Sequence, residues 1–95
     1  MNKKLMIGRL HLNMWEPSRE SINLGKVSRM ILNCGKVVDL YLHRYDSNYI
    51  LVISDGDKTW RSWLKTTEDM MCRLKGTGFE QKVYQLIKKD RGKDE

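Results

Sequence analysis

The stretch that decides the fold runs from Val37 to Leu64, where three runs of strand-forming residues alternate with two short polar segments. The runs are VVDLYLHRY (residues 37–45), YILVIS (49–54) and TWRSWL (59–64), and the segments between them are DSN (46–48) and DGDK (55–58). β-Branched and aromatic residues favour strands, whereas Asp, Asn, Ser and Gly favour tight turns. The Asp55-Gly56 pair also indicates a hairpin, because hairpin turns need backbone conformations that these residues tolerate. The stretch therefore predicts an antiparallel meander of three strands.

The alternation of side chains predicts what each strand of the meander buries. Nearly every residue of 49–54 is apolar, which indicates a central strand covered on both sides. In the first run, Leu40 and Leu42 share one face with Val38, while the aromatic and basic side chains lie on the other. In the third run, one tryptophan is expected to face the core, which leaves Trp63 beside Arg61 as the more exposed pair.

Two further elements are expected before the meander. Residues Leu5 to Trp15 alternate as a first strand, which Pro17 ends. From about Arg19 to Cys34 the apolar residues recur at helical spacing, and Gly35 is a natural helix stop. We therefore expect a helix over residues 19–34, or one that begins only at Lys26, because Gly25 interrupts the run.

After the meander, Thr66 or Thr67 can cap a second helix that ends at Gly76. Residues 79–89 fit either a helix or a strand, and we favour a strand that completes the sheet. The predicted fold is thus α+β, with an antiparallel sheet of four or five strands and two helices. Residues 1–89 would form this single domain, and residues 90–95 a disordered tail.

Size and charge restrict the function classes. The chain has 95 residues and a net charge of +6, which favours an anionic partner. A core this small leaves little stability in reserve, so a homodimer is expected. The two cysteines, Cys34 and Cys72, belong to no metal-binding motif and are expected to be buried and reduced. With no signal peptide and no run of about 18 apolar residues, a cytoplasmic protein with no membrane partner is expected.

Residues that could carry catalysis are few. The chain has two histidines, and no serine or glycine pattern of a known catalytic or phosphate-binding motif. His43 and Asp39 on one strand face could form an acid–base pair, but an acid–base pair alone makes a weak active site. We therefore predict that the protein is not an enzyme, and that it uses no cofactor and no metal.

Basic and aromatic residues point instead to nucleic acid. Phosphate contacts require positive charge, and exposed aromatic rings can stack on bases, which favours RNA somewhat over DNA. The predicted binding residues are Arg9, His11, Arg19, Lys26, Arg29, Arg44, Tyr45, Lys58, Arg61, Trp63, Lys65, Lys82, Lys88, Lys89 and Arg91. A protein-binding inhibitor of a host enzyme, docking through Trp63, Tyr45 and Arg61, is the alternative.

The order of elements from Val27 to Ile87 resembles the double-wing DNA-binding domain of the T-even phage middle-promoter activators. The resemblance is carried by MILNC (residues 30–34) as a helix end, YDSNYILV (45–52) as a hairpin, and a helix containing Met70 and Met71. This resemblance implies a phage protein with a saddle-like sheet that binds nucleic acid. It extends to a role in host takeover or counter-defence, such as inhibition of an RNA-based toxin–antitoxin system, or to DNA-binding modulation of transcription.

Overall fold

The computed structural model describes residues 4–7, 10–15, 21–32, 34–62 and 66–92. These residues form six strands and two helices. They are β1 (Lys4–Ile7), β2 (Leu10–Met14), β3 (Ser21–Ile31), β4 (Val37–Tyr45), β5 (Asn48–Ser54), β6 (Thr59–Ser62), α1 (Thr67–Arg73) and α2 (Glu80–Gly92). The predicted α+β class, with an antiparallel sheet and two helices, is confirmed.

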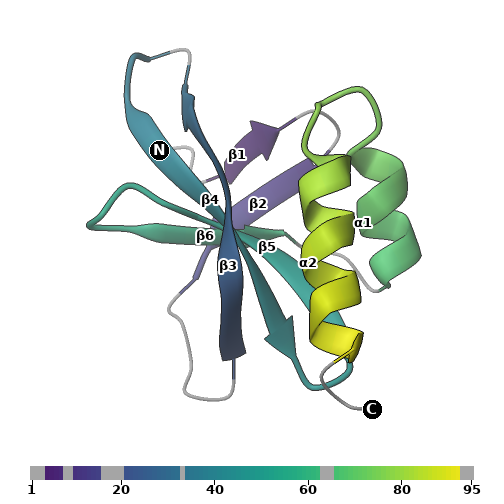
Figure 1. The fold of residues 1–95 in the computed structure, drawn as a ribbon. Helices are drawn as coiled ribbons and strands as arrows, with labels where there is room; N and C mark the ends of the chain where they lie inside the picture. The colour runs from purple at the N-terminus through teal and green to yellow at the C-terminus, as the bar shows by residue number, and fades with distance from the viewer. Residues whose placement is uncertain (1–3, 8–9, 16–20, 33, 63–65, 93–95) are drawn as a thin grey trace.

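One antiparallel sheet contains all six described strands, in the order β1-β2-β6-β5-β4-β3 (Figure 1). Strands β3 to β6 follow one another as a meander, so the three strands predicted over residues 37–64 are confirmed for the described part of that range. The N-terminal strands join the other side of this meander, because β2 pairs with β6. The segment expected as a single strand, Leu5 to Trp15, forms the two strands β1 and β2, which pair with each other.

The helix predicted over residues 19–34 is wrong, because residues 21–31 form the long strand β3. This includes Met30 and Ile31, which the resemblance to the double-wing domain takes as helical. Two irregularities in the pairing of β3 with β4 explain the error, since they skip Leu24 and Val27. Each bulge adds one residue, so the side chains that turn toward the core become Leu24, Val27 and Met30. The core-facing residues of β3 are therefore three positions apart, which is also the spacing of the apolar residues of a helix.

The strand favoured for residues 79–89 is also wrong, because α2 covers residues 80–92. Val83 and Ile87 are buried one turn apart, with Phe79 and Leu86 packed against the same core. These four positions form one stripe on a helix, whereas on a strand Leu86 and Ile87 would point to opposite faces. The helix also includes residues 90–92 of the predicted tail; residues 93–95 lie outside the described part.

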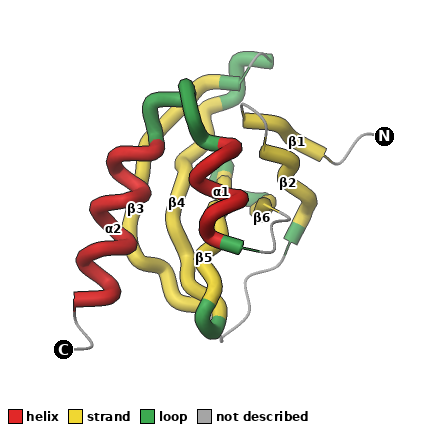
Figure 2. Tube along the Cα trace, turned by 90° about the vertical axis from the view of Figure 1, so that its right-hand side faces the viewer, coloured by secondary structure: helices red, strands yellow, loops and turns green. Residues whose placement is uncertain are grey.

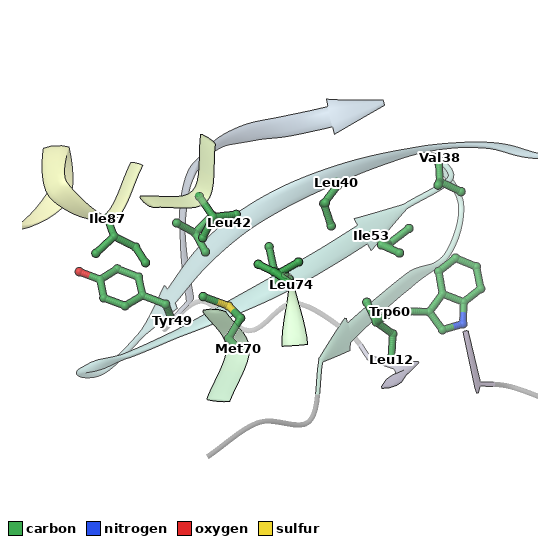
Figure 3. Packing of buried hydrophobic residues seen from close by; sticks show 12 residues of the cluster. Leu12, Val38, Leu40, Leu42, Tyr49, Ile53, Trp60, Met70, Leu74 and Ile87 are labelled. Carbon is green, nitrogen blue, oxygen red and sulfur yellow. The ribbon is translucent and has the colours of Figure 1, made fainter. Parts of the chain in front are cut away.

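Helices α1 and α2 lie side by side on one face of the sheet (Figures 1 and 2). Met70 of α1, Leu74 at the C-cap of α1 and Ile87 of α2 belong to the same buried cluster as Leu42 and Tyr49 of the sheet (Figure 3). The central strand β5 is buried on both faces, as predicted, because all five residues from 49 to 53 are buried.

The C-terminal turn of α2 is fastened to the sheet by Asp90. Its carboxylate accepts a hydrogen bond from the Tyr49 hydroxyl at 2.8 Å, and Arg44 Nε lies 3.7 Å from the same oxygen. Strand β3 passes beside this helix at Gly25, whose φ is +146°. A Cβ atom there would lie 3.1 Å from Leu86, so glycine permits both the backbone conformation and the close approach.

Candidate functional site

The second face of the sheet carries neither described helix, and we call it the helix-free face. Cross-strand partners share a face of a sheet, and one row of partners runs Lys26, Tyr41, Val52, Arg61 and Asn13 across β3, β4, β5, β6 and β2. Core leucines occupy the neighbouring row on the opposite face. The helix-free face therefore presents two cations and a tyrosine around Val52, which is only 2% exposed.

A further basic residue, Arg29, lies beside this row and is paired with an aspartate. Arg29 is the cross-strand partner of Asp39, two rows from the Lys26–Tyr41 pair and on the same face. Asp39 Oδ1 lies 3.1 Å from Lys26 Nζ and accepts a hydrogen bond from Arg29 Nε at 2.9 Å. The two basic neighbours hold the pKa of the Asp39 carboxyl below its usual value, and Asp39 in turn raises the pKa of Arg29. The Asp39 carboxylate is thus paired with Lys26 and Arg29, and not with His43 as an acid–base pair would require.

His43 of β4 forms a cluster with Ser21 of β3 and with Trp15, which directly follows β2. Its Nδ1 lies 3.0 Å from the Ser21 hydroxyl, and its ring meets the edge of Trp15 at a centroid distance of 6.0 Å. The Arg61 guanidinium lies 5.5 Å above the Trp15 ring, in a cation–π contact. These contacts connect the end of β2 to β4 across the helix-free face, so the sheet curves around this cluster. Because His43 is only 8% exposed, we assign this cluster a structural role in packing the sheet.

Acid is expected to weaken the fold through His43. Burial lowers the pKa of its imidazole below the ordinary 6.5, so the unfolded chain takes up this proton first as the pH falls. The stability contributed by neutral His43 is complete above pH 6.5 and is lost as the pH falls through the lowered pKa. Urea unfolding midpoints at pH 7.5 and 5.5 measure this loss.

His43→Gln is the matched variant, since glutamine keeps polar atoms but does not titrate. The difference between the two pH values should be smaller in this variant. The lowered pKa of Asp39 places its own loss of stability at more acidic pH, outside this window. An equal pH response in both proteins would contradict the prediction.

The structure brings together only part of the predicted binding set. Lys26, Arg29 and Arg61 share the helix-free face, and the alternation of β2 and β4 places His11 and Tyr45 on it as well. Lys58 lies in the turn between β5 and β6. Arg44 lies on the helix side, against Asp90. The α2 residues Lys82, Lys88, Lys89 and Arg91 are exposed on that side too. Arg9, Arg19, Trp63 and Lys65 lie outside the described residues.

Tyr41 and Lys36 are absent from the predicted binding set. The signal for Tyr41 is its place between Leu40 and Leu42, since flanking core residues direct the middle side chain to the other face. Lys36 lies at the start of β4, where its ammonium group pairs with Asp55 at 3.0 Å. Nothing in the sequence points to that pair, because the two residues belong to different turns.

Comparisons with protein-family models, with curated proteins and with solved structures found no match to this chain. Neither described helix has the length and apolar character that crossing a membrane requires. Within the described residues, no three or more His, Cys, Asp or Glu side chains gather where they could hold a metal ion. The predicted burial of Cys34 and Cys72 is wrong, because both thiols are free and exposed.

Proposed function

We propose that this protein binds nucleic acid through the helix-free face of its sheet. The observation that carries the proposal is the placement of Lys26, Arg29 and Arg61 on one curved face together with Tyr41. Phosphodiester groups bind wherever cations are concentrated, and the net charge of +6 assists their approach over a longer range.

Single-stranded RNA is the proposed ligand, and DNA is expected to bind less tightly. Tyr41 is half-buried in the middle of the basic row, where one ring could stack on an unpaired base. The rings of Trp15, Tyr49 and Tyr84 each already carry a cation on one side, at 5.5, 5.7 and 5.6 Å from the ring centroid. Base stacking is therefore assigned mainly to Tyr41, and phosphate contacts supply most of the affinity.

The biological role proposed is phage host takeover or counter-defence, including inhibition of an RNA-based toxin–antitoxin system. This part rests only on what remains of the resemblance to the double-wing domain, namely the hairpin over residues 45–52 and the helix that contains Met70 and Met71. It implies a host cytoplasm as the place of action. It adds no residue to the proposed binding surface.

The binding test is a titration of a fluorescently labelled single-stranded RNA, a single-stranded DNA and a DNA duplex with the protein. Affinity should fall steeply as salt is raised from about 0.05 M to 0.2 M, because binding releases counterions from the phosphates. The RNA should bind most tightly. Undetectable binding of all three at the lowest salt would overturn the proposal.

A protein partner is the competing outcome, and the structure offers it a different place. Met71 of α1 and Tyr84 of α2 line an open groove of about 490 Å³ together with Glu80 and Lys88. A pull-down from host lysate with and without nuclease separates the two functions. Capture that persists after nuclease, combined with no affinity for nucleic acid, would favour the protein-binding inhibitor.

A further inference from the structure

Asp39 is the acidic residue that the described part of the sheet places among the cations of the helix-free face. One of its oxygens contacts both Lys26 and Arg29, the two basic residues of β3. The three side chains are partly solvent-accessible, at 43% for Lys26, 64% for Arg29 and 26% for Asp39. The site is therefore open to a competing anion.

Asp55 and Asp90 also form ion pairs, but both stabilise the fold. The Asp55 carboxylate accepts hydrogen bonds from the backbone N–H groups of Asp57 and Lys58, at 2.8 and 2.7 Å, and so shapes the β5–β6 turn. Asp90 holds α2 against Tyr49. Asp39 makes its ion pairs across the exposed sheet surface, where such pairs contribute little to stability.

A phosphodiester can take the place of Asp39 between the same two cations. It carries one negative charge, like a carboxylate, and its two non-bridging oxygens can accept hydrogen bonds from Arg29 and Lys26 at once. Both cations come from one strand, so they are held at neighbouring positions on the sheet before any ligand arrives.

We propose that Lys26 and Arg29 form a backbone-phosphate site, which Asp39 occupies in the free protein and which the phosphate takes over on binding. This inference rests on the proposed nucleic-acid function. Asp39 thus acts as an internal competitor that weakens binding and keeps the two cations ordered. Removing its charge should strengthen binding, whereas a residue that merely positioned the cations would weaken binding when removed.

The test compares Asp39→Asn with Asp46→Asn, using the labelled single-stranded RNA. Both variants raise the net charge by one. Asp46 lies in the β4–β5 turn with φ 57°, a conformation that asparagine adopts readily. Asp39→Asn should bind about 3- to 10-fold more tightly than the wild type, and its salt dependence should steepen by roughly one released counterion. Asp46→Asn should stay within about 2-fold of the wild type.

A third protein identifies the cations responsible. In Asp39→Asn/Arg29→Gln, most of the gain should disappear, because a released cation is then missing. The inference is overturned if the wild type binds RNA but Asp39→Asn binds no better than Asp46→Asn. Absence of binding by the wild type and all variants would instead refute the proposed function. A thermal midpoint of Asp39→Asn within about 5 °C of the wild type would show that the substitution does not unfold the domain, because exposed ion pairs contribute little to stability.

Discussion

Replacing Lys26, Arg29 and Arg61 together by glutamine is expected to lower the affinity for single-stranded RNA on the order of 100-fold at about 0.1 M salt. The three cations share the helix-free face, and in the function that we propose one strand of nucleic acid contacts all of them. Each lost phosphate contact also removes about one counterion from the salt dependence, so its slope should decrease by roughly two to three. Fluorescence anisotropy over a range of salt concentrations measures both effects.

A triple variant on α2 provides the control with the same change in net charge. Lys82, Lys88 and Lys89 are exposed on the helix side of the molecule. Replacing them by glutamine should weaken binding by less than about 5-fold, through long-range attraction alone. Equal losses in the two triple variants would show that net charge, and not the helix-free face, governs binding. Thermal unfolding should accompany the test, since Arg61 also packs on Trp15.

The second large effect concerns the core. Leu51→Ala is expected to reduce the free energy of unfolding by about 3–4 kcal/mol, because the fully buried side chain leaves a cavity as well as losing its apolar contacts. A domain of this size has a stability of about 5–14 kcal/mol, so this single substitution removes a large part of it. Urea unfolding followed by tryptophan fluorescence measures the change.

Ile31→Ala is the matched control, because it also deletes a branched aliphatic side chain from a strand. Ile31 is 70% exposed at the end of β3, and its removal should change stability by less than about 0.5 kcal/mol. A loss as large as that of Leu51→Ala would mean that Ile31 is covered in solution, as it would be in a homodimer.

The meander was predictable because its signals are local. Turn residues mark the ends of β4, β5 and β6, and the apolar run of β5 indicates burial on both faces without any knowledge of its neighbours. The elements on either side were harder to predict because their patterns depend on tertiary structure. Bulges in β3 produced a helical spacing in a strand, and a short apolar run such as residues 79–89 fits both periods.

The candidate site was predictable in its residue types but not in its arrangement. Lys26, Arg29 and Arg61 were selected for their charge, and nothing local shows that they share a face. That result depends on β3 being a strand and on its pairing with β4. Arg44 shows the opposite case, since its charge suggested binding, whereas the fold places it beside Asp90.

The bulges of β3 also bear on how the protein stays in solution. β3 is the terminal strand of the described sheet, and a long, regular edge can recruit strands from other molecules and start aggregation. The two bulges in its pairing with β4 bend and twist this edge strand, and Lys26 and Arg29 place positive charge beside them. The residues that we assign to phosphate binding thereby also repel the same edge of a second copy. A substitution that straightened β3 is therefore expected to promote aggregation, whether or not the protein binds RNA.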